Sequence, residues 1–172
     1  MKVMILISIF ILSACSSQYT NQLPLNKNFP NVSGESLSGK VWDIPKEMSG
    51  RKVLFLIGYK QDSQFDIDRW LIGLDMTNTK VEVYELPTIK GMFPRMFKQK
   101  INTGMKRGIP QMLWKSVITI YKDGEKVQKF TGNENPNNTR VILLNPKGRI
   151  IYFYDKGFSV YALNNLREII NE

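Results

Sequence analysis

The chain has 172 residues, with 24 Lys and Arg against 15 Asp and Glu, no His and one Cys. This is the length of one domain, and a hydrophobic content of 42% is ordinary for a globular protein. The absence of His excludes Ser-His and Cys-His catalytic relays and the usual His-containing zinc sites, while a single Cys excludes an intrachain disulfide and a CxxC redox pair.

The first fifteen residues predict export. Lys2 precedes an apolar run over residues 3–12, and small residues follow, which is the pattern of a secretory signal peptide. As a helix the run would rise only about 15 Å, half the thickness of a bilayer core, so it is too short to span a membrane. Leu12-Ser13-Ala14-Cys15 resembles the lipobox of bacterial lipoproteins. An ordinary signal peptide with an incidental Cys is the alternative.

The lipobox resemblance implies that residues 1–14 are a lipoprotein signal peptide and that Cys15 becomes the first residue, acylated with chains such as palmitate. The protein would then be anchored to a membrane of the cell envelope through Cys15. Because Ser16 rather than Asp follows the Cys, the resemblance implies an outer membrane location facing the periplasm if the cell is Gram-negative. Residues 15–28 are polar and predict a flexible tether, and residues 29–172 predict one folded domain.

The first half of the domain predicts a hairpin, a buried strand, a helix and a second strand. Residues 29–45 have the turn and strand residues of a short hairpin, and the nearly continuous apolar run at 52–57 is typical of a strand buried on both faces. After it, Ser63 and Asp66 are expected to cap a helix as a capping box. The inward face of that helix has apolar residues at helical spacing: Ile67, Trp70, Leu71 and Leu74. The second strand is predicted at 80–86.

The second half predicts a helix, two hairpins and a last helix. An amphipathic helix is expected from about Pro94, interrupted by Gly104 and Gly108. A β-branched strand at 116–122 is expected to turn at Asp123-Gly124 into a strand at 126–130. The second hairpin pairs the strands at 139–144 and 149–154, and Ser159 is expected to cap the last helix.

This order of elements resembles the thioredoxin-like fold, within its peroxiredoxin and thiol-reductase-like branch. Residues 29–52 are similar to that branch's N-terminal hairpin and its lead into the first core strand, and residues 138–150 to its T-x-x-x-h-D-x-x-G-x-I hairpin. Residues 58–70 resemble the first helix of the cysteine-free mitochondrial ATP synthase assembly factors that share the fold. The resemblance implies an α/β sandwich, with a central mixed sheet flanked by helices and an N-terminal hairpin.

Aligned on the strand at 52–58, the family's CxxC motif falls on Ser63-Gln64-Phe65-Asp66. A serine hydroxyl cannot replace a thiolate without a strong base, and the chain has no His to supply one. Ser63, Asp66 and Arg69 are therefore a candidate pseudo-active site, in which we expect no catalytic residue, no cofactor and no metal. The family's cis-proline position falls within residues 137–140, where no Pro occurs, and Pro110, in a register that differs from this branch, is the alternative. A cysteine-independent enzyme that uses the Ser63 helix start is the alternative.

The excess charge is concentrated in one segment. Eight basic and no acidic residues lie from Leu86 to Lys122, whereas the rest of the chain after Cys15 has fifteen of each sign. Aromatic and Met side chains lie between the charges, which is typical of a surface for an acidic protein partner or an anionic lipid. The predicted basic surface comprises Lys90, Arg95, Lys98, Lys100, Lys106 and Arg107. A solvated basic face is the alternative, and nucleic acid is not expected, because basic charge alone reads no bases.

Together these features predict a membrane-anchored envelope lipoprotein with a redox-inactive thioredoxin-like domain that binds a partner or assists assembly, and not an enzyme. Besides the cysteine-independent enzyme, a second alternative is a structural protein that binds anionic envelope lipid through residues 86–122.

Overall fold

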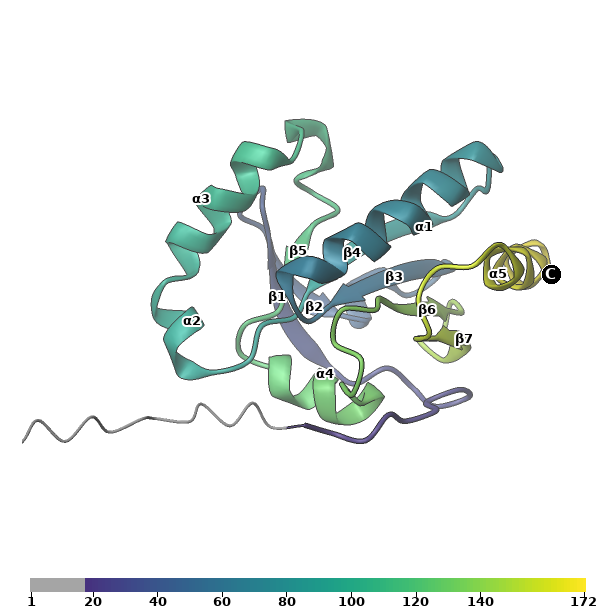
Figure 1. Cartoon of the computed structure of the whole chain (residues 1–172), viewed down its shortest axis with the longest axis horizontal. Helices are drawn as coiled ribbons and strands as arrows, with labels where there is room; N and C mark the ends of the chain where they lie inside the picture. Colours follow the sequence, from purple (N-terminus) through teal and green to yellow (C-terminus); the bar gives the residue numbers. More distant parts are fainter. Residues whose placement is uncertain (1–17) are drawn as a thin grey trace, which may run out of the picture.

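Residues 18–172 are described by a computed structural model (Figure 1). Cys15 and the predicted signal peptide lie outside the described residues. The strands are β1 (Val32–Ser36), β2 (Val41–Ile44), β3 (Val53–Gly58), β4 (Glu82–Pro87), β5 (Ile118–Thr119), β6 (Arg140–Leu144) and β7 (Ile150–Tyr154). The helices are α1 (Gln64–Met76), α2 (Met92–Met96), α3 (Lys98–Gly108), α4 (Gly124–Thr131) and α5 (Val160–Asn171). Short 3₁₀ turns are η1 (Lys46–Met48), η2 (Gln61–Ser63) and η3 (Gln111–Leu113).

The strands form one four-stranded and one three-stranded sheet. The four-stranded sheet has the order β4-β3-β6-β7, with β3 parallel to β4 and the other pairs antiparallel. The N-terminal hairpin β1–β2 joins β5 in the antiparallel order β2-β1-β5. Isolated bridges from Glu85 to Val117 and from Thr88 to Ile120 connect β4 to the β5 region, so the two sheets meet there. The predicted α/β class, with a central mixed sheet, flanking helices and an N-terminal hairpin, is confirmed.

Strand β3 divides the core into two layers. All six of its residues are buried, because neighbouring strands cover both edges and helices cover both faces. Phe55 and Ile57 point into the layer that includes Val127 of α4, while Leu54 and Leu56 point into the layer filled from α1 and α5. In Figure 1, α1 and α4 accordingly lie on opposite sides of the sheet. The alternation along β3 thus fixes which side of the sheet receives α1.

The predicted strand at 126–130 is wrong, because these residues belong to helix α4. The buried residues of α4 are Gly124, Val127, Gln128 and Thr131, at the spacing i, i+3, i+4 and i+7 of a helix face. Asp123-Gly124 therefore begins a helix instead of turning a hairpin. The other predicted strands are present, although β5 is much shorter than the predicted 116–122. Ser159 caps α5 as predicted, since its hydroxyl accepts the N–H of Ala162.

Residues 91–115, hereafter the α2–α3 arm, connect β4 to β5. The arm stands at one end of the molecule, on the left in Figure 1. Neither α2 nor α3 has a buried residue. The predicted helix is divided at Phe97 and continues through Gly104, so the expected interruption at Gly104 is wrong. No helix among residues 18–172 combines the length and apolar character that crossing a bilayer requires.

The stretch before the hairpin is bonded to the domain. The carbonyl of Tyr19 accepts the N–H of Asn133 at 2.9 Å, and the N–H of Asn26 donates to the carbonyl of Ile150 at 2.9 Å. A side chain on Gly132 would collide with the backbone of Asn21. Residues 19–28 are therefore part of the folded unit, which begins earlier than the predicted start at residue 29, and this part of the predicted flexible tether is wrong.

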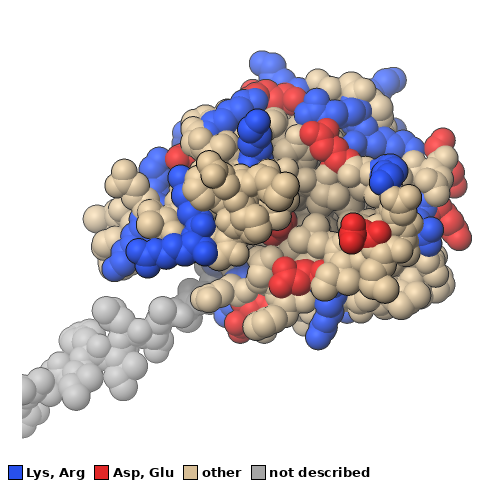
Figure 2. Space-filling view, turned by 90° about the horizontal axis from the view of Figure 1, so that it is seen from above, with Lys and Arg blue, Asp and Glu red and all other residues tan. Residues whose placement is uncertain are grey.

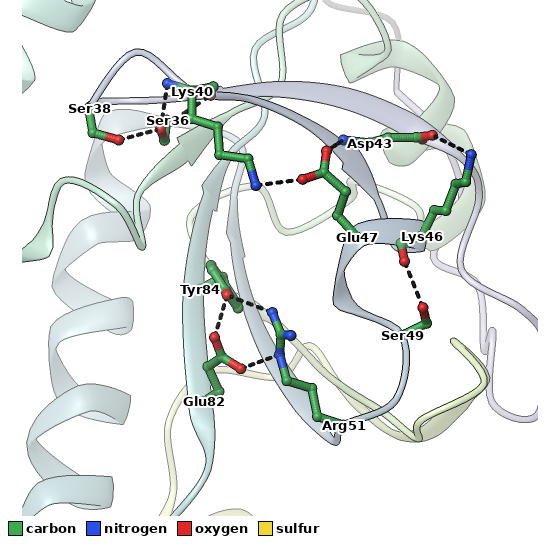
Figure 3. Close-up of polar contacts among 10 residues, drawn as sticks. All are labelled: Ser36, Ser38, Lys40, Asp43, Lys46, Glu47, Ser49, Arg51, Glu82 and Tyr84. Carbon is green, nitrogen blue, oxygen red and sulfur yellow. Dashed lines mark hydrogen bonds and ion pairs between the residues drawn. The ribbon is translucent and has the colours of Figure 1, made fainter.

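Charged groups around the N-terminal hairpin and the neighbouring strand β4 pair with one another (Figure 3). Lys40 contacts Glu47, and Arg51 contacts Glu82 and donates to the hydroxyl of Tyr84. Each of these pairs is solvent-exposed and adds at most about 1 kcal/mol to stability. These pairs matter for the distribution of charge, because each of these basic side chains has an acidic side chain beside it that balances its positive charge.

Candidate functional site

The β3–α1 corner, residues 58–66, is where the chain passes from the central strand into helix α1. It lies at the carboxyl end of β3, beside the carboxyl end of the parallel strand β4. Ligand and catalytic sites of open α/β sheets are found at this edge. The corner contains Ser63 and Asp66, the two positions on which the sequence resemblance places the family's cysteines.

The hydroxyl of Ser63 is buried and faces its own turn. Its Oγ donates to the carbonyl of Lys60 at 2.6 Å, and the residue is 2% exposed. A Cβ on Gly58 would overlap this Oγ, so the glycine makes room for it. The predicted cap is wrong: Ser63 has helical backbone angles because η2 precedes α1, and its side chain accepts no N–H. An N-cap needs a non-helical backbone.

Asp66 joins three parts of the chain. Its Oδ2 accepts the N–H of Thr139 at 2.9 Å and its Oδ1 accepts the N–H of Phe158 at 2.7 Å, while the residue is only 6% exposed. The predicted capping-box role is therefore wrong, since both oxygens bond distant backbone. Hydrogen bonds to an ionised carboxylate are stronger than neutral ones. Asp66 thus fixes α1 to the starts of β6 and α5.

Arg69 does not join the other two predicted site residues. It is exposed on α1, and within residues 18–172 it makes no ion pair with Asp62 or Asp66. Its neighbours on the exposed side of α1 are Phe65, Ile72 and Met76, which are 71%, 58% and 81% exposed. These four residues, spaced i, i+4, i+7 and i+11, form the α1 outer face.

The sequence analysis missed a buried cation, Arg140, which lies against Tyr59 of the corner. Arg140, at the start of β6, has no exposed surface, and its guanidinium lies 4.8 Å from the ring centre of Tyr59. Its Nη1 donates to the carbonyls of Asn135 and Asn138 at 2.6 and 2.8 Å. Burial lowers the pKa of Arg140 and raises that of Tyr59 to about 12. The signal in the sequence was a single Arg preceding four consecutive apolar residues.

Glu85 is a second buried ionisable group outside the predicted site. It lies in β4 with 9% exposure, and burial raises the pKa of its carboxyl. Gln64 links it to α1, because the amide Nε2 donates to Glu85 at 3.3 Å and to Asp68 at 2.9 Å. A carboxyl with a raised pKa is a common feature of catalytic sites. Here, however, its polar contacts are with neighbouring side chains of the fold.

Two hollows in the surface of the described residues lie away from the corner. One is bordered by Asn26, Asn145 and Arg149, and the other by Leu23 and residues 153–156. Neither includes Ser63, Asp66 or Arg69. Ser63 and Asp66 at the corner are therefore buried and bonded within the fold, and neither of these two hollows gives the corner a substrate cavity.

The six residues of the predicted basic surface differ in their surroundings. Lys98 pairs with Glu35 at 2.9 Å, and Arg95 donates to the carbonyls of Tyr121 and Lys122 at 3.2 and 2.9 Å. Two others lie over aromatic rings: Lys106 over Trp114 at 4.8 Å and Lys90 over Tyr19 at 5.1 Å. Lys100 and Arg107 are exposed on α3. Figure 2 shows Lys and Arg side chains set among uncharged ones at this end of the molecule.

Large apolar side chains lie beside these charges. In α2 and directly after it they are Met92, Phe93, Met96 and Phe97, with exposed fractions of 76%, 73%, 72% and 45%. The rings of Phe93 and Phe97 pack against each other at 5.0 Å. The structure thus brings the predicted basic residues together with an exposed apolar cluster that the sequence analysis had described only as interleaved residues.

No protein-family model matches the chain, and no curated protein matches it in sequence. Solved structures match in fold. The thioredoxin domain of a thiol-disulfide oxidoreductase from Bacteroides vulgatus is 16% identical, with a TM-score of 0.55 over 87% of this chain and 100% of that one. Yeast Sco1 with copper bound is 11% identical, with a TM-score of 0.60 over 88% and 95%. A SCO1/SenC family lipoprotein from Bacillus anthracis is 12% identical, with a TM-score of 0.58 over 88% and 97%. The predicted thioredoxin-like fold is confirmed.

Copper favours thiolate, thioether and imidazole ligands. The chain has no His and a single Cys, at position 15, so among residues 18–172 Met thioethers are the only ligands of these three kinds. Among residues 18–172 no group of three or more His, Cys, Asp or Glu could hold a metal ion.

Proposed function

We propose that this protein is an envelope lipoprotein, anchored through Cys15, whose thioredoxin-like domain carries out no thiol chemistry and binds a protein partner, as in assembly or folding of envelope proteins. The lipobox at 12–15 supports the anchor. A lipoprotein of the same fold, from Bacillus anthracis, is among the structural neighbours. Several acyl chains hold a protein stably on a membrane, where one gives only marginal binding.

The observation that carries the proposal is the state of the β3–α1 corner. Ser63 donates to the carbonyl of Lys60, and Asp66 accepts two backbone N–H groups, so the polar atoms of both side chains are bonded within the fold. A nucleophile needs exposure and an adjacent base, and Ser63 has neither. We infer that the corner has the structural position of a thioredoxin-like active site without the groups that react.

Binding is assigned to the α1 outer face, which begins at the same corner. Its three apolar side chains are more than half exposed and surround Arg69, and the acidic Asp68 and Asp75 lie on the same exposed side of α1. Contiguous exposed apolar side chains with a polar rim mark protein interaction sites. The matching partner surface would offer apolar groups framed by basic ones.

Site-specific photocrosslinking in intact cells tests the partner. A photoreactive residue at Ile72 is expected to give a discrete adduct of higher mass with the full-length, lipidated protein. The same residue at Asn164, exposed on α5, is the matched control and is expected to give none. Adding Arg69→Ala should weaken the adduct at Ile72. Equal labelling at both positions, or none at either, would contradict a docking role for α1.

The remaining parts of the proposal have separate measurements. Mass spectrometry of the membrane-purified protein should show residues 1–14 removed and acyl mass on Cys15, and Cys15→Ser should release the protein or leave it unprocessed. The lipidated protein should show no insulin reduction and no peroxide turnover, because no Cys follows residue 15. A free thiol on Cys15 defeats the anchor, and thiol-dependent turnover defeats the redox-inactive domain.

A further inference from the structure

We propose that the α2–α3 arm lies on the anionic surface of the bilayer that holds the lipid anchor, with the apolar side chains of α2 in the headgroup region. This inference rests on the proposed lipidation of Cys15. It assigns a second contact with the membrane and leaves the α1 outer face for the protein partner.

The exposed side chains of the arm have the composition that the bilayer surface requires. The arm presents Phe93 and Met96 at 73% and 72% exposure, and Met112 in η3 at 85%. Apolar residues of this size rarely remain exposed together unless they contact a partner or a membrane. Interfacial helices place such residues in the boundary between headgroups and acyl chains, and Lys and Arg at the headgroups.

The charge of the arm selects an anionic surface. Residues 86–122 contain no acidic side chain, so acidic partners come from elsewhere in the fold. Among residues 18–172 the one ion pair to the arm is Lys98 with Glu35. In contrast, the basic groups near the N-terminal hairpin have acidic neighbours (Figure 3). The positive charge of Lys100 and Arg107 is therefore available to lipid phosphates.

The path of the N-terminus places the arm close to the anchor. Three residues lie between Cys15 and Tyr19, and the four steps of chain span at most about 14 Å when fully extended. The ring of Tyr19 is 5.1 Å from the ammonium of Lys90, two residues before α2 begins at Met92. The N–H of Tyr19 also donates to Asn133, which holds this segment against the domain. A lipid on Cys15 would thus keep the start of α2 within a short distance of the bilayer.

Fluorescence quenching in vesicles tests this contact. The lipidated full-length protein is labelled with bimane at Phe93→Cys and reconstituted into phosphatidylcholine vesicles, with and without phosphatidylglycerol, that contain lipids brominated in their acyl chains. We expect strong quenching at position 93 in the anionic vesicles and much weaker quenching in the neutral ones. The same label at Tyr161→Cys, on an exposed position of α5, should stay unquenched in both.

Charge variants separate the arm from the anchor. Lys100→Gln with Arg107→Gln should weaken docking about fivefold for each removed charge and so reduce quenching at position 93. The matched control, Lys147→Gln with Lys156→Gln, removes two exposed charges beside β7 and should change nothing. Added salt should act as the arm variant does, because it screens charges beyond about 8 Å.

Equal, weak quenching at positions 93 and 161 in anionic vesicles would overturn the proposal. The proposal would also fail if the label at position 93 stayed accessible in vesicles and became shielded only in native membranes. That result would show that a protein, and not lipid, covers the arm. Failure of this proposal is distinguishable from failure of the proposed function: an unacylated Cys15 is detected by mass in the same sample, and the quenching of the label by added anionic vesicles still reports on the arm.

Discussion

Polar side chains are directed inward at the β3–α1 corner, whereas apolar side chains are directed outward in the α2–α3 arm. At the corner, the Asp66 carboxylate is 6% exposed and accepts two backbone N–H groups from distant segments. In the arm, Phe93 is 73% exposed, and its ring packs against another ring of the arm, that of Phe97. The first region follows the rule that buried polar groups are bonded, and the second departs from the rule that large apolar groups are covered.

The corner therefore contributes to the stability of the fold, whereas the arm presents exposed side chains that are available for binding. The hydrogen bonds of Asp66 hold α1 against the starts of β6 and α5, so a change there affects three elements at once. The arm bonds to the domain through polar contacts such as those of Arg95 with the carbonyls that follow β5, and neither of its helices has a buried residue. Substitutions at the corner should therefore reduce stability, and substitutions in the arm should leave it nearly unchanged.

The largest effect is expected from Asp66→Ala. The substitution leaves the N–H groups of Thr139 and Phe158 without their acceptor, and each unsatisfied buried donor costs about 1–3 kcal/mol. The free energy of unfolding, measured by urea denaturation, should fall by about 2–4 kcal/mol. Asp75→Ala, at an exposed acidic position of the same helix, should change it by no more than about 0.5 kcal/mol. Equal losses from the two variants would contradict the bonding role of Asp66.

Gly58→Ala should lower the free energy of unfolding by about 2 kcal/mol, a smaller loss than that of Asp66→Ala. The added Cβ would overlap the hydroxyl of Ser63 and lie 3.2 Å from the side chain of Ile67. Ser63→Ala alone should cost about 1 kcal/mol through its lost hydrogen bond to Lys60. The double variant should be more stable than the sum of the two losses implies, because removing the hydroxyl removes the collision. Strict additivity in denaturant titrations would show that Ser63 does not fill the space beside Gly58.

A pH-dependent effect is expected at Glu85, whose carboxyl accepts the side-chain amide of Gln64 at the corner. Burial raises the pKa of its carboxyl in the folded state, so folding disfavours the ionised form. The stability contributed by this group is complete below its ordinary pKa of 4.5 and is lost as the pH rises through the folded value. Glu85→Gln should therefore raise the melting temperature slightly at pH 7. The two proteins should converge in acid, and a difference that stays constant with pH would exclude ionisation as its cause.

Much of the fold could be predicted because its signals are local. The apolar run of β3 and the helical spacing of Ile67, Trp70 and Leu74 are set by burial on one or both faces, and the structure has both elements. Helix α4 was missed because Asp123-Gly124 is a turn signal that serves a hairpin or a helix start equally well. Its buried face includes Gly124 and Gln128, which a hydrophobicity pattern does not count.

The candidate site was less predictable, since it depends on contacts between distant segments. Ser63 and Asp66 were correctly located in sequence at the start of α1, but their assumed capping partners were local and the actual partners of Asp66 are 73 and 92 residues away. The buried position of Arg140 below Tyr59 also follows from tertiary packing. By contrast, the charge of the arm is a property of composition, and the sequence alone identified it.

The smallest change in stability is expected where the apolar surface is largest. Phe93→Ala with Met96→Ala removes two large side chains that are more than 70% exposed, so little buried area is lost and no cavity forms. The melting temperature should stay nearly constant, whereas Ile67→Ala, the buried control at 2% exposure, should cost about 2–5 kcal/mol. Association of the arm with anionic vesicles should be lost in the same double variant, because the area that enters the headgroup region is gone. If the double variant were as destabilised as Ile67→Ala, these side chains would be part of the core, and the contrast between the corner and the arm would fail.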